Sequence, residues 1–143
     1  MVVREAMTPH AETVAPENTL QEAALKMRTL NVGALPVMAG PHLVGIVTDR
    51  DIVVRAVANG LAPLATPVSE AMTPQSVWCF EDQDTLEAAR IMEAMAVRRL
   101  MVLDRERRLV GMITVDDIAA VARQERVAGE VIDRSVVMRP IPA

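Results

Sequence analysis

The sequence predicts an α/β fold of the α+β kind, made of two pseudo-symmetric β-α-β-β-α units packed through their sheets. Motifs of the first half return in the second half: REAMTP at 4–9 returns as SEAMTP at 69–74, and LVGIVTDRDI at 43–52 returns as LVGMITVDDI at 109–118. The repeats keep one order, and each half mixes helical periodicity with short apolar runs. Two repeats are too few for a solenoid, so we expect the units to bury their apolar faces against each other.

Each unit begins with a short extended segment and then a helix. Thr19 with Glu22 forms a capping-box signature before the first helix, and Asp84 with Glu87 imitates it before the second. Apolar residues at helical spacing then predict one buried face per helix. The expected faces are Leu20, Ala23, Ala24, Met27 and Leu30 in unit one, and Leu86, Ala89, Met92, Met95 and Ala96 in unit two.

Two short apolar strands joined by a polar turn follow each of these helices, and a closing helix is expected to begin near Thr48 or Thr114. The expected strands are 34–38, 43–47, 99–103 and 109–113.

The repeat also sets the expected domain boundaries. We assign unit one to residues 1–60 and unit two to residues 69–122. Residues 61–68 contain two prolines and are expected to link the units, while 123–143 are expected to hold a helix end and a tail.

The composition argues against several classes of protein. A net charge of −4, without a basic stripe interleaved with aromatic residues, argues against nucleic-acid binding. No apolar run approaches the ~18 residues of a membrane span, and the amino terminus lacks the apolar core of a signal peptide. A lone Cys79 has no disulfide partner, which favours a reducing compartment. We therefore expect a cytoplasmic protein with no membrane partner.

The residues that usually carry catalysis are sparse. His10 and His42 lack the spacing of metal ligands, Cys79 has no histidine nearby in the sequence, and no serine motif resembles a nucleophile elbow. The sequence therefore predicts a protein that is not an enzyme, with no metal site and no required cofactor.

The repeated Thr-x-x-Asp motif has two open interpretations. It can cap the helix that follows, with the threonine and the aspartate bonding each other's backbone amides. The same helix start, with free N–H groups and a partial positive charge, also suits a phosphate, and the carboxylate suits neighbouring hydroxyl groups. The two interpretations differ in where the aspartate side chain points.

The doubled motifs resemble a tandem pair of cystathionine-β-synthase (CBS) domains, also called a Bateman module, of the small stand-alone prokaryotic type. The resemblance covers residues 2–122 and rests on MTP, GALPV and GIVTDRDI in unit one, and on MTP, VRRLMVL and GMITVDDI in unit two. It implies a homodimer, an unknown protein target, and an adenosyl ligand such as AMP, ADP or ATP in the cleft between the units.

The resemblance also implies roles for individual residues. In the family the matching aspartate holds the ribose and the matching threonine or serine meets phosphate, which here are Asp51 and Asp117, Thr48 and Thr114. The extended segment before the first helix contributes to the adenine slot in the family, which here implies Val14.

The implied cleft is not symmetric. Family members often place His or Arg before the first strand after the helix, where unit two has Arg98 and Arg99 but unit one has Gly33 and Ala34. The two arginines are interpreted either as phosphate contacts or as solvated side chains. Three interpretations of unit one stay open: its pocket takes an uncharged group, it shares the two arginines across the pseudo-twofold axis, or Arg50 is a substitute cation.

Trp78 is either a base-stacking residue or part of the core. Two functions remain open as well. The first is a regulatory module that senses an adenosyl ligand. The second is a ligand-free structural or interaction dimer, favoured by the missing cation in unit one and by Met101 in place of Pro36.

Overall fold

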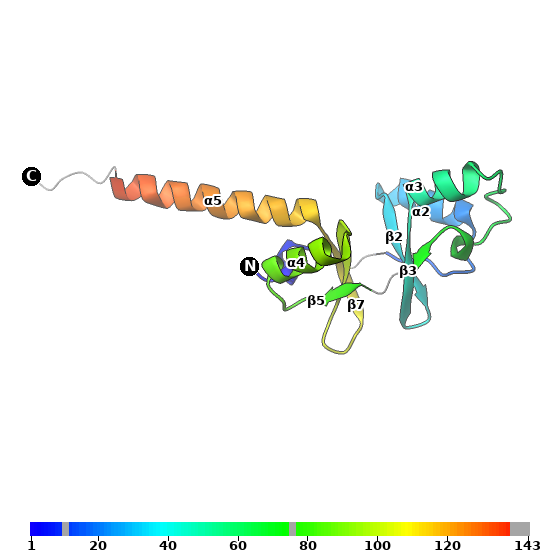
Figure 1. Ribbon diagram of the computed structural model, residues 1–143, viewed down its shortest axis with the longest axis horizontal. Helices are drawn as coiled ribbons and strands as arrows, with labels where there is room; N and C mark the ends of the chain where they lie inside the picture. Colours follow the sequence, from blue (N-terminus) through cyan, green and yellow to red (C-terminus); the bar gives the residue numbers. More distant parts are fainter. Residues whose placement is uncertain (10–11, 75–76, 138–143) are drawn as a thin grey trace, which may run out of the picture.

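The computed structural model shows two bodies side by side, with a long helix projecting from one of them (Figure 1). The structure describes residues 1–9, 12–74 and 77–137, and of 131–137 the backbone alone. Unit one contains α2 (Leu20–Leu30), β2 (Ala34–Ala39), β3 (His42–Thr48), α3 (Asp49–Asp51) and the π-helix η1 (Ile52–Val57). Unit two contains β5 (Trp78–Phe80), α4 (Thr85–Met95), β6 (Arg99–Leu103), β7 (Leu109–Thr114) and α5 (Val115–Val137). Between and before them lie α1 (Val3–Ala6), β1 (Thr8–Pro9), the 3₁₀ helix η2 (Val68–Glu70) and β4 (Thr73–Pro74).

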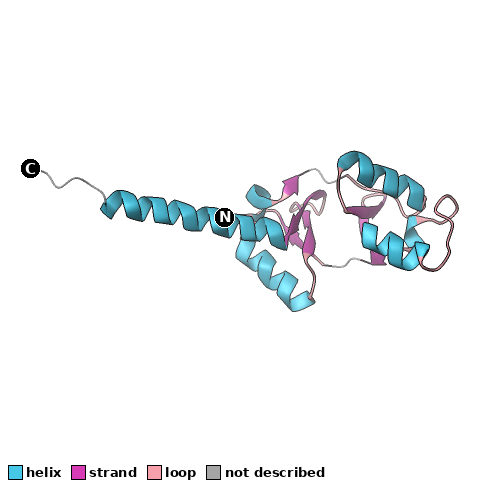
Figure 2. Ribbon diagram, turned by 90° about the horizontal axis from the view of Figure 1, so that it is seen from above, coloured by secondary structure: helices cyan, strands magenta, loops and turns pink. Residues whose placement is uncertain are grey.

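The two sheets face each other, and the helices lie outside them (Figure 2). One sheet has the strand order β2-β3-β4 and the other β1-β7-β6-β5. Ala34 and Ile46 of the first sheet form one buried apolar cluster with Met101 of the second. This shared cluster confirms the prediction of two units packed through their sheets, and it buries the faces that one unit alone would leave in water.

The short segments at the start of each repeat cross to the other unit. β1 pairs antiparallel with β7 of unit two, and Val3, just before it, is fully buried in the core of unit two. In the reciprocal arrangement β4 pairs with β3 of unit one, and Val68 is fully buried in the core of unit one. Each MTP motif therefore ties the two bodies together.

This crossing gives a physical reason for the glycine in both copies of the repeated motif. A Cβ atom on Gly111 would lie 2.5 Å from the carbonyl oxygen of Thr8, and one on Gly45 would lie 2.7 Å from the carbonyl oxygen of Thr73. Real Cβ atoms essentially never approach backbone that closely. Only glycine lets the crossing strand lie against β3 or β7 at this distance.

The first helix follows the sequence expectation closely. Thr19 and Glu22 form the reciprocal capping box at the start of α2. Leu20, Ala23 and Met27 are buried beneath it. Ala24 and Leu30, which were expected on the same face, are exposed instead.

The face expected for the second helix is wrong except at Met92, which is buried as predicted. Leu86 and Met95 of α4 are 57% and 53% exposed. Asp84 caps α4 by accepting a hydrogen bond from the amide of Leu86 at 2.8 Å, and Thr85, Ala88 and Met92 are the buried residues. Glu87 accepts from Gln83 rather than closing a capping box.

Within the described residues, the segments predicted as a linker, 61–68, and as a helix end and tail, 123–143, are more ordered than those terms suggest. Residues 61–68 lie against unit one, where the buried Thr66 accepts a hydrogen bond from the amide of Leu20 at 2.9 Å through its carbonyl oxygen. Helix α5 continues without a break through residue 123 to Val137 and projects beyond the body of unit two (Figure 1). The rest of the expected tail, 138–143, lies outside the described residues.

Candidate site in the cleft between the units

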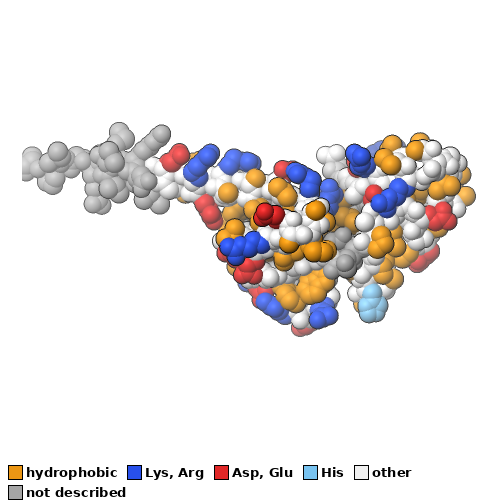
Figure 3. All heavy atoms as spheres, in the orientation of Figure 1, with side chains coloured by type: hydrophobic (Ala, Val, Ile, Leu, Met, Phe, Trp, Pro, Cys, Tyr) orange, Lys and Arg blue, Asp and Glu red, His pale blue; other side chains and the backbone are white. Residues whose placement is uncertain are grey.

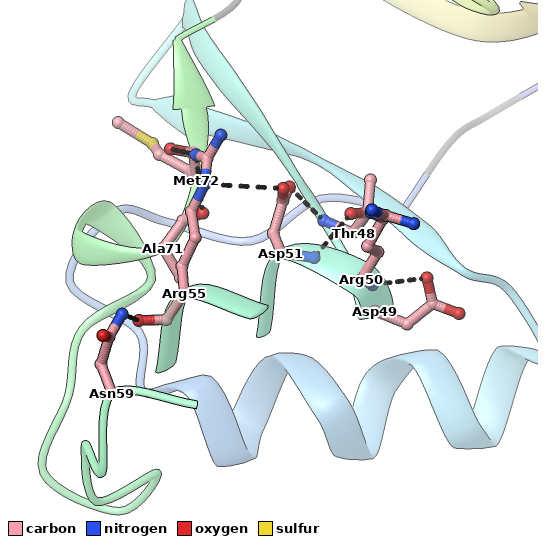
Figure 4. Close-up of polar contacts among 8 residues, drawn as sticks. All are labelled: Thr48, Asp49, Arg50, Asp51, Arg55, Asn59, Ala71 and Met72. Atoms are coloured by element: carbon pink, nitrogen blue, oxygen red, sulfur yellow. Dashed lines mark hydrogen bonds and ion pairs between the residues drawn. The ribbon is translucent and has the colours of Figure 1, made fainter. Parts of the chain in front are cut away.

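Both Thr-x-x-Asp motifs form reciprocal caps at the point where a strand ends and a helix begins. In unit two the amide of Thr114 donates to Oδ2 of Asp117 at 2.9 Å, and the amide of Asp117 donates to Oγ1 of Thr114 at 3.1 Å. In unit one Thr48 and Asp51 make the same two bonds, both at 3.0 Å (Figure 4). Capping is therefore a role that both motifs have, and each cap contributes roughly 0.5–2 kcal/mol.

The two aspartates differ in what their second oxygen meets. Oδ1 of Asp51 lies 4.0 Å from Nε of Arg55, whose guanidinium also donates to the carbonyl of Met72 at 2.9 Å (Figure 4). In unit two the residue four positions after Asp117 is Val121, which is buried. Within the described part of the chain, Oδ1 of Asp117 has no hydrogen-bond or ion-pair partner.

A cavity of about 380 Å³ lies between the units and is lined from both of them. It brings together four of the residues expected in the site, Gly33 and Ala34 of unit one and Arg99 and Thr114 of unit two. This volume is within the usual range for small-molecule sites. The other described lining residues are Thr8, Pro9, Glu12, Leu30, Val32, Leu35, Pro36 and Met112.

Among the described lining residues, the cation of this cavity comes from unit two. Arg99 pairs in register with Thr114 across β6 and β7, so their side chains leave the same face of the sheet. Ala34 stands opposite Thr48 in the corresponding pair of unit one and supplies no charge. Among the described residues, no carboxylate lies within ion-pairing distance of Arg99.

The remaining expected site residues are not among the described residues that line the cavity. Arg98 lines a groove between α4 and α5 instead, beside Glu93 and Ile118. Val14 is buried, with its backbone bonded to Pro36 and Met38 on β2. The described lining does not include Thr48, Arg50, Asp51 or Asp117, although the Asp117 cap holds the lining residue Thr114.

The sequence did not predict that the crossing segment β1 lines part of the cavity. Thr8 and Pro9 reach the cavity because β1 pairs with β7, where Thr8 stands opposite the lining residue Met112. The repeated MTP motif was the available signal for them. Glu12 is the acidic group of the lining, and its carboxylate lies 3.8 Å from Nζ of Lys26, so its negative charge is partly neutralised.

The described residues outside this cavity show little that would support catalysis. Burial raises the pKa of the Cys79 thiol to about 11, so the reactive thiolate is disfavoured. Within residues 1–9, 12–74 and 77–137, no group of three or more His, Cys, Asp or Glu side chains could hold a metal ion. None of the described helices combines the length and apolar character that a membrane crossing requires.

The model of the CBS domain family matches the chain twice, at residues 3–57 and 68–123. The chain belongs to the CBS domain family. The two matched segments coincide with the two repeats, so the protein is a CBS pair, as the doubled motifs indicated. Hypoxic response protein 1 of Mycobacterium tuberculosis is 36% identical to this CBS pair over 117 residues, which are 81% of each chain.

Solved structures of other CBS pairs share the arrangement. The structure of Hypoxic Response Protein I with two coordinated zinc ions is 34% identical, with a TM-score of 0.73 over 84% of this CBS pair and 98% of that chain. CBSX2 in complex with AMP is 28% identical, with a TM-score of 0.72 over 87% and 98%. The CBS pair of MJ0100 in complex with methylthioadenosine and S-adenosyl-L-methionine is 26% identical, with a TM-score of 0.76 over 87% and 98%.

Proposed function

We propose that this CBS pair is a regulatory, non-catalytic module that binds an adenosyl ligand, such as AMP, ADP or ATP, in the cavity between its units. The observation that carries the proposal is the convergence of Arg99 and Thr114 on one cavity of suitable size, beside the Asp117 cap. Two structural relatives contain adenosyl ligands, AMP in CBSX2 and methylthioadenosine with S-adenosyl-L-methionine in MJ0100.

The chemistry of unit two suits a nucleoside phosphate. Arg99 offers a planar guanidinium fork that matches phosphate oxygens, and it has no competing carboxylate among the described residues. The hydroxyl of Thr114 accepts from the amide of Asp117, which leaves its own hydrogen for a phosphate oxygen. Asp117 is not itself among the described lining residues, but its cap holds the lining residue Thr114. We assign its Oδ1 to the ribose hydroxyls of a ligand at that edge of the cavity.

Unit one is the weaker half of the proposed site. Asp51 divides its carboxylate between the Thr48 amide and the guanidinium of Arg55, and Ala34 brings no cation. A ribose hydroxyl would have to compete with Arg55 for the same oxygen. We therefore propose one phosphorylated ligand per chain, held chiefly by unit two.

Occupancy would be signalled through the relative position of the units. The cavity is lined by Gly33 and Ala34 on one side and by Arg99 and Thr114 on the other, so a ligand contacts both bodies. A ligand shifts such an equilibrium only if it binds one arrangement more tightly than the other. The target of the signal would be a protein that distinguishes these arrangements.

We also propose that the module acts as a homodimer. Apolar side chains lie exposed on the outer helices, Val53, Val54 and Val57 on η1 and Leu86 and Met95 on α4. Their similar chemistry on both units suits a second copy of the same chain, since closed pairs are the commonest oligomers. Light scattering at micromolar concentration is expected to give twice the chain mass. A clean monomer would contradict the dimer and leave ligand binding to be judged separately.

Calorimetric titration with AMP, ATP, NADH and S-adenosylmethionine tests the ligand proposal. Saturable heat with at least one adenosyl ligand, at about one ligand per chain, is the expected result. Absence of heat together with absence of any thermal shift at millimolar ligand would overturn it. That outcome would favour the ligand-free interaction dimer, the function that the Arg55-bound Asp51 and the uncharged Ala34 independently support.

A further inference from the structure

A second cavity, of about 350 Å³, lies at the opposite edge of the interface, where the hairpins of the two units end. Met38 and His42 of the β2–β3 hairpin form one side, and Trp78, Leu103 and Arg107 of unit two form the other. None of its described lining residues lines the Arg99 cavity. Figure 3 shows a hollow at this lower rim of the molecule, with basic and hydrophobic side chains on one body and a histidine side chain on the other.

The cavity lies beside the two aromatic side chains of the chain. Trp78 and Phe80 contact edge to face, with ring centroids 4.9 Å apart, and Trp78 lines the cavity. The position that corresponds to Trp78 in unit one is Thr13, so this feature is not part of the repeated fold. The Trp78 ring offers an apolar, polarisable wall of the kind on which planar rings stack.

Three neighbouring arginines on the β6–β7 hairpin are used in different ways. Arg105 bonds Asp82 at 2.8 Å and covers Phe80, and Arg108 bonds Asp104 at 2.8 Å. The guanidinium carbon of Arg107 lies 5.8 Å from the centroid of the Trp78 ring, near the outer limit of a cation–π contact. Among the described residues, no carboxylate lies within 4.0 Å of the Arg107 guanidinium.

We propose that this second cavity binds a small planar aromatic anion, such as an aromatic carboxylate. The ring would lie against Trp78 and the adaptable thioether of Met38, and the anionic group would meet Arg107. His42 adds two polar nitrogens at the rim, and none of the described lining residues is acidic. The site is independent of the proposed adenosyl site and of its ligand.

Trp78 also reports on the site directly. The chain has one tryptophan and no tyrosine, so its intrinsic emission comes from Trp78. Salicylate is a suitable probe, and salicylamide is its matched control because it has the same ring and no negative charge at neutral pH. Salicylate is expected to quench Trp78 emission saturably, and calorimetry is expected to show salicylamide binding about tenfold more weakly or worse, the loss typical of a charge-assisted contact.

Variants of the hairpin separate a specific site from general quenching. Arg107→Gln should weaken salicylate binding about tenfold, whereas Arg107→Lys, which keeps the charge, should stay within about threefold of the wild type. Arg105→Gln is the matched control, since Arg105 is on the same hairpin but binds Asp82. Asp117→Ala should leave salicylate affinity unchanged even if adenosyl binding is lost.

The proposal is overturned by non-saturable quenching, by equal affinity for salicylate and salicylamide, or by equal losses in the Arg105 and Arg107 variants. Displacement of salicylate by AMP would also overturn it, because the probe would then occupy the other cavity. A failure of AMP binding with intact salicylate binding would count against the proposed adenosyl function alone.

Discussion

Oδ1 of Asp51 lies 4.0 Å from Nε of Arg55, whereas the corresponding aspartate, Asp117, has Val121 at the corresponding position. Both caps use Oδ2 of the aspartate, so the copies differ in the remaining Oδ1, which lies near Arg55 in Asp51 and has no partner among the described residues in Asp117. This difference lies one helical turn beyond the repeated motif. It makes the two halves of the module chemically unequal.

Arg99 is expected to contact the phosphate of the ligand. Arg99→Gln should weaken AMP binding about tenfold and leave adenosine binding nearly unchanged, because a charge-assisted contact is lost only for the phosphorylated ligand. Calorimetry with AMP and adenosine measures the difference. Arg98→Gln is the matched control, since Arg98 lines the groove between α4 and α5. Equal losses in both variants would argue against a specific phosphate contact.

The threonine hydroxyls of the caps are expected to contribute to stability even without ligand. Thr114→Val keeps the shape of the side chain but removes the acceptor for the Asp117 amide, so the free energy of unfolding should fall by about 1 kcal/mol. Urea denaturation measures it. Thr29→Val, at an exposed position inside α2, should change stability by less than about 0.5 kcal/mol. An unchanged free energy of unfolding in Thr114→Val would show that this cap does not contribute to stability.

Glycine at 111 is expected to be required by the crossing strand. Gly111→Ala would place a methyl group 2.5 Å from the carbonyl of Thr8, which should cost about 1–3 kcal/mol of stability. Gly129→Ala, where the new Cβ has nothing within 4 Å on helix α5, should instead stabilise by roughly 0.5–1 kcal/mol. Denaturant unfolding is expected to show a lower free energy of unfolding for Gly111→Ala and a higher one for Gly129→Ala. An unchanged free energy of unfolding in Gly111→Ala would mean that β1 does not lie against β7 in solution.

The buried thiol is expected to make the fold sensitive to alkaline pH. Burial raises the pKa of Cys79 in the folded state from 9.0 to about 11, whereas the unfolded thiol keeps its ordinary value. The unfolded state therefore ionises first, and stability on the order of 2 kcal/mol is lost as pH rises from about 9 towards 11. Denaturation of the wild type beside Cys79→Ala measures the loss. A pH dependence that survives in Cys79→Ala would assign it to other groups.

Much of the fold could be predicted because its signals are local. The capping residues Thr19 and Glu22, the apolar runs of the strands, and the strand-to-helix step at Thr48 and Thr114 each depend on a few neighbouring residues. The doubling of these signals fixed the two-unit architecture. The pairing of β1 with unit two depends on contacts between distant segments, and no local pattern encodes such contacts.

The second helix shows where local reasoning fails. Asp84 was predicted to be a cap like Thr19, yet Leu86 was still expected on the core face. Because Asp84 does cap α4, the counterpart of the buried Leu20 is Thr85. The cap shifts the face by one residue, so Leu86 becomes exposed. Apolar spacing alone leaves this choice open, because alanine and leucine fit both faces.

The sequence predicted several individual residues of the candidate site, but it did not predict which neighbouring side chains face the cavity. Gly33, Ala34, Arg99 and Thr114 meet at one cavity, as the pseudo-symmetric pair implied. Arg98 lines the groove on the helix side, although its chain neighbour Arg99 lines the cavity between the sheets. Arg55 was not predicted to be a partner of Asp51. The corresponding residue in unit two is Val121, so the repeat gave no signal for it.

The most direct test of the adenosyl proposal compares the AMP-induced shift in melting temperature for Asp117→Ala and Asp51→Ala. Each variant removes one cap, so both should melt below the wild type by a similar amount without ligand. If Asp117 holds the ribose, AMP will still raise the melting temperature of Asp51→Ala but will no longer raise that of Asp117→Ala. A full AMP shift in Asp117→Ala, or its loss in Asp51→Ala alone, would contradict a ligand held by unit two.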